Sequence, residues 1–332
     1  MYYIKKSISE KGFIDKDIEK NINIVEEILK LKKKKNAIIL GHFYQEPKIQ
    51  DISDYLGDSL YLAQIAEKTN ADIIVFAGVY FMAETAKMLS PQKKVLLPDL
   101  NAGCSLSDSC STNDFKKFKE KHSDHIIISY VNTTSEIKAL TDICCTSTNA
   151  VQIVESLPEN EKIIFAPDRN LGNYINSVTN RNMLIWDGAC HVHEEFSLEK
   201  ILELKNKNPD AKIIAHPECQ KQILIISDHI GSTSSLLKFT KLDNGKIYIV
   251  ATESGILHQM KKISPDKIFI PAPPKDSTCG CNDCKYMKLI NLDKLYNTLK
   301  YELPEIIMND ELIKMAVKPI KQMLEISEKL GL

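Results

Sequence analysis

Short, nearly continuous apolar runs recur along the chain and alternate with stretches of helical periodicity. The first runs, at residues 36–40 (NAIIL), 72–77 (DIIVFA) and 94–98 (KVLLP), are rich in Ile, Val, Phe and Ala and show no polar alternation. Such runs are typical of parallel strands that helices cover on both faces. The intervening stretches, among them 59–68 (SLYLAQIAEK), have the spacing of such helices. The pattern therefore predicts an α/β protein with parallel sheets.

The pattern occurs three times. His42, Tyr130 and His216 each close an apolar run, and they are 88 and 86 residues apart. Seventeen residues after each of these anchors stands a small hydroxyl residue: Ser59, Ser147 and Thr233. Because independent markers keep the same register, we interpret the chain as three internal repeats.

The repeats define the expected domain organisation. We predict a lead-in helix with the first α/β repeat, a second repeat, a third repeat, and C-terminal helices that pack back on the body. The corresponding ranges are residues 1–108, 109–194, 195–290 and 291–332.

Composition excludes several functional classes. A formal net charge of −1 over 332 residues gives no basic face for nucleic acid. No run approaches about 18 uninterrupted apolar residues, so no membrane span is predicted. Residues 1–17 lack the apolar core of an export signal, so we expect a cytoplasmic protein. In a reducing compartment, its nine cysteines are better suited to metal or redox chemistry than to disulfides.

Polar residues follow the predicted strands where parallel sheets bind ligands, beyond the carboxyl ends. Tyr44, Asn132 and Glu218 each lie two residues after an anchor. The hydroxyl residues Ser59, Ser147 and Thr233 fall where helices are expected to begin, and helix N-termini bind anions. Three such ends could hold a molecule with several carboxylates or a phosphate, although each hydroxyl could instead be an ordinary helix cap. Glu218 is a candidate base, whose pKa we expect to rise in a desolvated centre.

The cysteines keep step with the repeats. Cys104 and Cys190 follow the first two anchors by 62 and 60 residues, and a cluster of Cys279, Cys281 and Cys284 starts 63 residues after the third. A structural zinc site would need a second cysteine pair, which the chain lacks. Three thiolates from three repeats favour an iron–sulfur cubane whose fourth iron has no protein ligand and can act as a Lewis acid.

These residues resemble the quinolinate synthase family of NAD biosynthesis, and the resemblance runs in order from about residue 40 to 295. The matching stretches are GHFYQEPKIQDISDYLGDSL, AGCSLSDSC, YVNTTSEIKALTDICCTSTNAV, WDGACHVHEEF, AHPEC, IGSTSSL and CNDCKYMKLINL. The resemblance implies three similar three-layer α/β/α domains in a pseudo-threefold triangle around a central active site. It also implies a [4Fe–4S] cluster on Cys104, Cys190 and Cys284, with Cys279 and Cys281 as bystanders.

The activity that the resemblance implies is a transferase-type synthesis. Iminoaspartate condenses with dihydroxyacetone phosphate to give quinolinate, phosphate and water, with possible transient contact with L-aspartate oxidase. Glu218, His216, Tyr44 and His42 are then catalytic. The expected substrate-binding residues are His42, Ser59, Tyr130, Asn132, Ser147, His216, Glu218 and Thr233, with His191 and His193 further out. A cluster-based sensor and a hydro-lyase acting on one hydroxy acid remain alternatives.

Overall fold

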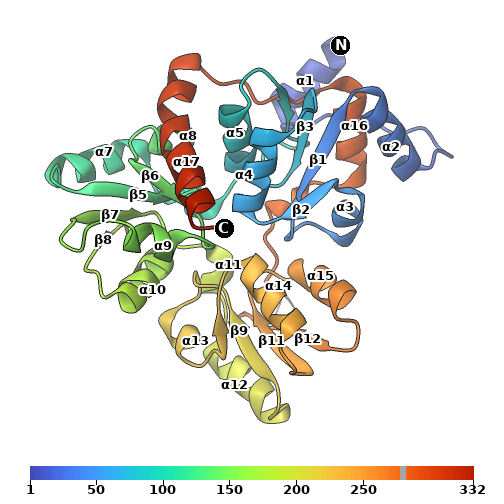
Figure 1. Ribbon diagram of the computed structural model, residues 1–332. Coiled ribbons are helices and arrows are strands. Elements are labelled where there is room, and N and C mark those ends of the chain that lie inside the picture. Colours follow the sequence, from blue (N-terminus) through green and yellow to red (C-terminus); the bar gives the residue numbers. More distant parts are fainter. Residues whose placement is uncertain (277–281) are drawn as a thin grey trace.

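The computed structural model of the protein describes residues 1–276 and 282–332. Three parallel four-stranded sheets lie around a common centre, as Figure 1 shows. The predicted α/β class and the triangular arrangement of three α/β domains are confirmed. The predicted boundaries between the domains stay a prediction.

The first sheet has the order β2-β1-β3-β4. Its strands are β1 (Ala37–His42), β2 (Tyr55–Gly57), β3 (Ile73–Ala77) and β4 (Lys94–Leu96), and its helices are α3 (Pro47–Ile52), α4 (Ser59–Lys68) and α5 (Tyr80–Leu89). Every residue of β3 is buried, as its unbroken apolar run predicts.

The second sheet repeats this order as β6-β5-β7-β8. It contains β5 (Ile126–Tyr130), β6 (Ile143–Cys145), β7 (Ile163–Ala166) and β8 (Leu184–Ile185), with helices α7 (Thr112–Lys121), α8 (Ser135–Lys138), α9 (Ala150–Glu155) and α10 (Arg169–Thr179).

The third sheet has the equivalent order β10-β9-β11-β12. It consists of β9 (Lys212–Ala215), β10 (His229–Ile230), β11 (Ile247–Ala251) and β12 (Ile268–Pro271), with helices α12 (Leu198–Lys207), α13 (Lys221–Ile225), α14 (Thr233–Leu242) and α15 (Ile256–Ile263). Each repeat thus places its first and third strands at the centre of its sheet.

The segment between β1 and α4 contains elements that the hydrophobic pattern did not indicate. It holds α3 and the short strand β2, and the other two repeats have a helix and a short strand at the same place. Pro47 occupies the first turn of α3, where its missing N–H costs nothing. Tyr55 and Leu56 are not buried, so β2 leaves no apolar run in the sequence to reveal it.

Short helices and the chain termini complete the molecule. The short helices are α6 (Ser105–Asp108), α11 (His191–Glu194) and the 3₁₀ helix η1 (Met287–Leu289). The terminal helices are α1 (Tyr2–Lys11), α2 (Ile24–Lys34), α16 (Leu292–Tyr301) and α17 (Asp310–Lys329). None of the helices in the described part of the chain is long and apolar enough to cross a membrane.

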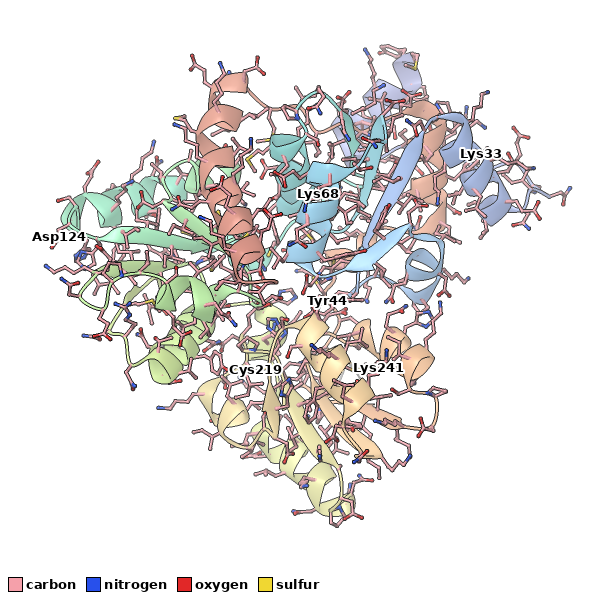
Figure 2. All side chains as sticks on the ribbon, in the orientation of Figure 1. Lys33, Tyr44, Lys68, Asp124, Cys219 and Lys241 are labelled. Carbon is pink, nitrogen blue, oxygen red and sulfur yellow. The ribbon has the colours of Figure 1, made fainter. Side chains whose placement is uncertain are left out.

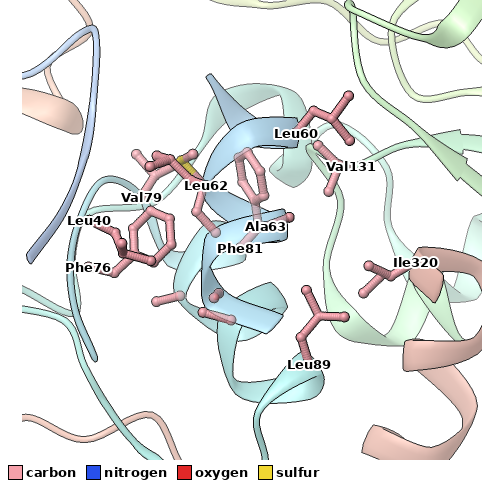
Figure 3. Close-up of a cluster of buried hydrophobic side chains, with 14 of the residues drawn as sticks. Leu40, Leu60, Leu62, Ala63, Phe76, Val79, Phe81, Leu89, Val131 and Ile320 are labelled. Atoms are coloured by element: carbon pink, nitrogen blue, oxygen red, sulfur yellow. The ribbon is translucent and has the colours of Figure 1, made fainter. Parts of the chain in front are cut away.

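The hydrophobic cores are shared unequally among the repeats. The first two repeats and the C-terminal helices form one large cluster, to which Leu60, Val131 and Ile320 all belong (Figure 3). Two smaller clusters cover the two faces of the third sheet, and Phe43 from the first repeat packs into one of them. Burial of apolar surface therefore joins repeats one and two more extensively than it joins either to repeat three.

Candidate active site

The carboxyl ends of the three sheets surround one cavity with about 710 Å³ of space free of protein atoms, its open mouth included. In Figure 2, Tyr44 lies where the repeats meet, whereas Lys33 and Asp124 lie on the outside. The cavity brings together every residue that we predicted for the site. These are His42, Tyr44, Ser59, Cys104, Tyr130, Asn132, Ser147, Cys190, His216, Glu218, Thr233 and Cys284.

The two anchor histidines are held by the same turn. The backbone N–H of Tyr44 donates to Nδ1 of His42 at 3.1 Å, and that of Glu218 donates to Nδ1 of His216 at 3.3 Å. Because Nδ1 accepts a hydrogen bond in both rings, the proton of each neutral imidazole is on Nε2. Burial lowers the pKa of His42 to about 4 and that of His216 to about 3, so both rings are neutral at pH 7.

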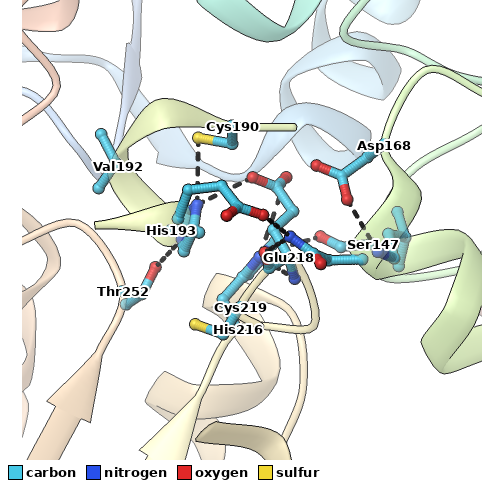
Figure 4. Close-up of polar contacts among 12 residues, drawn as sticks. Ser147, Asp168, Cys190, Val192, His193, His216, Glu218, Cys219 and Thr252 are labelled. Atoms are coloured by element: carbon cyan, nitrogen blue, oxygen red, sulfur yellow. Dashed lines mark hydrogen bonds and ion pairs between the residues drawn. The ribbon is translucent and has the colours of Figure 1, made fainter. Parts of the chain in front are cut away.

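Glu218 lies at the centre of the polar contacts, as Figure 4 shows. The Tyr130 hydroxyl donates to its Oε1 at 2.6 Å, and Nδ1 of His193 lies 2.9 Å from its Oε2. Burial opposes the charge of this carboxylate, but the neighbouring histidines and the Tyr130 hydroxyl outweigh burial and lower the pKa of Glu218. The expected raised pKa was wrong, because the sequence did not show these donors converging on one carboxylate.

A chain of hydrogen bonds connects Tyr44 to Glu218. The Tyr44 hydroxyl lies 2.7 Å from Oγ1 of Thr252, which lies 3.1 Å from Nε2 of His193. With the His193 ring neutral and its Nδ1–H directed at Glu218, Nε2 accepts from the threonine hydroxyl, and that hydroxyl accepts from Tyr44. Burial raises the pKa of Tyr44 well above its usual value, so the phenol keeps its proton.

The predicted hydroxyl residues are not the helix caps. Ser59 and Thr233 are the first residues of α4 and α14, whereas the capping side chains are those of Asp58 and Ser232. Ser147 precedes the start of α9, and its hydroxyl lies 3.1 Å from Nε2 of His216. None of these three hydroxyls caps a helix. The sequence had left helix capping open as an alternative role for them, and the structure does not support that role.

Asn132 presents an unpaired oxygen at the cavity. Its Oδ1 is buried and accepts no hydrogen bond from the described residues. A buried amide oxygen without a donor costs free energy, so this atom is suited to accept a hydrogen bond from a ligand.

The three candidate cysteine ligands occupy related positions. Cys104 and Cys190 immediately precede the short helices α6 and α11, and Cys284 lies just before η1. Burial raises the pKa of Cys104 to about 12 and also raises the pKa values of Cys190 and Cys284. The thiolate form therefore needs the positive charge of a metal centre. Cys279 and Cys281 lie outside the described residues.

The spacing of the donors bears on the kind of metal centre. A single zinc ion bound at about 2.3 Å would bring its sulfur ligands to within about 4 Å of one another. Among the described residues, only Cys190, His193 and Glu218 place their donor atoms within 4.8 Å of one another. The three thiols therefore surround a space larger than a single ion. The group around Cys190 is a smaller candidate metal site.

Several buried polar residues of the site were not predicted from the sequence. Glu253 lines the cavity and accepts hydrogen bonds from the backbone N–H of Cys284 at 3.1 Å and from Nζ of Lys288 at 2.9 Å. Two others are Asp58, which also lines the cavity, and Thr252, which bonds to Tyr44 and His193. Thr252 and Glu253 directly follow β11, at the same edge of the sheet as His216, and that position was the available signal.

Comparison with known proteins agrees with this geometry. Residues 26–325 match the model of the family described as quinolinate synthetase A protein. The chain belongs to the quinolinate synthetase A family. It is 54% identical over 307 residues to the quinolinate synthase of Chloroherpeton thalassium, covering 92% of this chain and 95% of that protein. It is 57% identical over 305 residues to the quinolinate synthase of a Synechocystis species, covering 92% and 96%.

The relatives also show that the family members are enzymes. The quinolinate synthase of Nostoc punctiforme is 55% identical over 306 residues, which cover 92% of this chain and 94% of that protein. The predicted family is thus confirmed, and with it the expectation that this chain is an enzyme of the synthase type.

Proposed function

We propose that the protein condenses iminoaspartate with dihydroxyacetone phosphate to give quinolinate, phosphate and water. The observation that carries this proposal is the single cavity in which one thiol from each repeat meets the aligned His, Tyr, Asn, Ser, Thr and Glu side chains. One substrate is a dicarboxylate and the other a phosphate ester. A cavity lined by hydroxyl, imidazole and amide donors suits both.

We further propose that Cys104, Cys190 and Cys284 hold a [4Fe–4S] cluster. The fit rests on three half-buried thiols, one per repeat, that line one cavity and are spaced more widely than the ligands of one ion. When bound, such a cluster supplies one iron without a protein ligand, which serves as a Lewis acid toward a substrate hydroxyl or carboxylate. Glu253 accepts from the backbone N–H of Cys284 and so fixes the loop that carries this ligand.

Binding of the anionic groups falls to neutral donors. Nε2–H of His42, the hydroxyls of Ser59 and Thr233, and the amide of Asn132 line the cavity. Neutral donors that are already oriented bind carboxylate and phosphate oxygens without reorganising during the reaction. Nε2–H of His216 donates to the Ser147 hydroxyl at 3.1 Å, and this bond orients the hydroxyl as a further donor.

Proton transfer falls to Glu218 and its partners. The carboxylate is ionised and already accepts from Tyr130 and His193, so a proton removed from substrate is shared across this group. Tyr44, at the other end of the hydrogen-bonded chain through Thr252, keeps its proton and can donate it to a leaving oxygen. The base and the acid of the reaction thus lie at opposite ends of one chain.

The cellular setting follows from the substrates. Iminoaspartate is labile, so a transient contact with the L-aspartate oxidase that forms it is part of the proposal. A cytoplasmic location would keep the cysteines reduced before a cluster is inserted.

The test is iron, acid-labile sulfide and quinolinate formation by protein purified without oxygen, with aspartate oxidase supplying iminoaspartate. We expect about four iron and four sulfide per chain, lost in Cys104→Ser, Cys190→Ser and Cys284→Ser. Cys110→Ala is the matched control, because Cys110 is buried in a separate apolar cluster. Bound zinc, or iron that persists in the three serine variants, would overturn the cluster. Turnover of a single hydroxy acid without quinolinate would favour a hydro-lyase.

A further inference from the structure

One carboxylate joins all three repeats at the cavity. Asp58 is buried at the start of α4, where its Oδ1 accepts from the backbone N–H of Tyr61 at 3.0 Å. Its Oδ2 accepts from the hydroxyl of Thr148, in the second repeat, at 2.9 Å. The same oxygen accepts from the hydroxyl of Ser234, in the third repeat, at 2.6 Å.

Each residue of this contact is a chain neighbour of a hydroxyl that faces the cavity. Asp58 precedes Ser59, Thr148 follows Ser147, and Ser234 follows Thr233. Consecutive Cα atoms are about 3.8 Å apart, so fixing one residue limits the movement of the next. The separation of the three cavity hydroxyls therefore depends on the contact at Asp58.

The unequal cores explain why a polar contact is needed here. Repeats one and two share a large apolar cluster, whereas the third sheet is covered mainly by clusters of its own. The position of repeat three at the cavity therefore depends more on polar bonds than the positions of repeats one and two do. Hydrogen bonds to a charged acceptor are about twice as strong as neutral ones and hold a defined direction.

The repeats are asymmetric at this point, as such a contact requires. The residue before the cavity hydroxyl is Asp58 in repeat one, Thr146 in repeat two and Ser232 in repeat three. At the position after the cavity hydroxyl, repeat one has Leu60, whereas repeats two and three have the donors Thr148 and Ser234. Repeat one thus supplies the charged acceptor, and each of the other two repeats supplies one hydroxyl donor.

We propose that Asp58 is a positioning residue that clamps the three repeats together, so that Ser59, Ser147 and Thr233 are held at the spacing that binds substrate. This inference rests on the proposed function for the identity of the ligand. Asp58 itself uses its oxygens on protein donors, and it acts on substrate only through the neighbouring hydroxyls.

The variants separate the clamp from the helix cap. Asp58→Ser keeps a good capping residue for α4 but is too short to reach both hydroxyls. Thr148→Val and Ser234→Ala each remove one of the two hydrogen bonds to Oδ2 of Asp58 and leave Asp58 itself in place. Ser235→Ala is the matched control, because the Ser235 hydroxyl bonds to Nε2 of His229 at 3.0 Å within repeat three.

The first readout does not depend on the activity. Amide hydrogen exchange, measured on the protein with its cluster, should be faster by about tenfold at residues 147–150 and 232–236 in Asp58→Ser, Thr148→Val and Ser234→Ala. The Ser235→Ala variant should match the wild type at 147–150. Unchanged exchange in all three clamp variants would overturn the clamp, whether or not the protein makes quinolinate.

The second readout is binding of pyridine-2,3-dicarboxylate, the planar product, and the split between KM and kcat. We expect Thr148→Val and Ser234→Ala each to weaken binding and raise KM by about tenfold, or about 1.4 kcal/mol, with kcat changed less. In the Asp58→Ser background, the two further substitutions should add no effect. Wild-type affinity in Thr148→Val and Ser234→Ala would overturn the proposal. If the wild type neither binds nor forms this product, the proposed function fails, and hydrogen exchange alone decides the clamp.

Discussion

Thr252 offers a sharp test of the hydrogen-bonded chain, because valine has its shape without its hydroxyl. The substitution Thr252→Val leaves the Tyr44 hydroxyl without its acceptor and Nε2 of His193 without its donor. His193 is buried, whereas Tyr44 is half-buried at the cavity. A buried polar group left unpaired costs about 1–3 kcal/mol, so we expect the free energy of unfolding to fall by about 1–3 kcal/mol, mainly through His193.

The matched control is the same substitution at Thr298. This residue is also buried, but its Oγ1 has no hydrogen-bond partner among the described residues. Thr298→Val removes an unsatisfied group and creates none, and threonine and valine have similar helix propensities. We expect its stability to be unchanged or slightly increased.

Urea denaturation of the two variants measures the difference. The urea concentration at the unfolding midpoint should fall for Thr252→Val and stay the same for Thr298→Val. The slope of the unfolding free energy with urea concentration should be unchanged in both. Quinolinate formation should fall about 10²-fold in Thr252→Val only, as for the loss of a proton-transfer partner. Equal midpoints for the two variants would refute the assignment of the Thr252 hydroxyl as the link between Tyr44 and His193.

Three further predictions concern single residues of the cavity. Glu218→Gln removes the charge that holds Tyr130 and His193, so steady-state kcat should fall about 10²-fold or more with iron content unchanged; near-normal kcat would exclude Glu218 as the base. Burial lowers the pKa of His42 to about 4, whereas an unfolded histidine takes up its proton near 6.5. Stability present above pH 6.5 should therefore be lost on acidification toward pH 4, so the stability of the wild type relative to His42→Asn should fall by up to about 3 kcal/mol. A difference between their urea midpoints that does not vary with pH would contradict this. Asn132→Ala should weaken binding of pyridine-2,3-dicarboxylate about tenfold in a calorimetric titration, because it removes an amide N–H that can donate to a carboxylate. The urea midpoint should not change, because Oδ1 accepts no hydrogen bond from the described residues; an equal loss of stability would show a structural role instead.

The repeat was readable from the sequence because burial leaves a simple mark. Strands covered on both faces are mostly apolar, so β1, β5 and β9 appear as apolar runs that a polar residue closes or directly follows. The polar residues at those ends then fall into register without any knowledge of the tertiary structure. This is why the sequence predicted the fold and a large part of the residues around the cavity.

The contacts between repeats, in contrast, produce no recognisable pattern in the sequence. The bond from Ser234 to Asp58 joins residues 176 positions apart, and serine is common at helix starts for local reasons. Similarly, Thr252 is one hydroxyl after a strand, and its importance depends on Tyr44 and His193 reaching it from other segments. Periodicity shows which face of an element is buried, but it does not show which side chains meet across an interface.

The pKa of Glu218 illustrates the same limit. Burial alone favours the protonated form, and burial is expected for a residue at the end of a parallel strand. The opposite result comes from His193, which lies on α11 and reaches Oε2 at 2.9 Å. A group's protonation depends on how many donors converge on it, and convergence is a property of the folded chain.

The repeats also explain how one symmetric scaffold can hold unlike substrates. Tyr44, Asn132 and Glu218 occupy the same position in the three repeats, two residues after the strand-end anchor. At that position the backbone N–H of Tyr44 and of Glu218 orients the ring of the preceding histidine. The side chains are a phenol that keeps its proton, a neutral amide and an ionised carboxylate. The threefold backbone thus fixes three equivalent places around the thiols. The difference among the side chains in those places gives the cavity an acidic, a neutral and a basic side, which suits the two substrates of the proposed reaction.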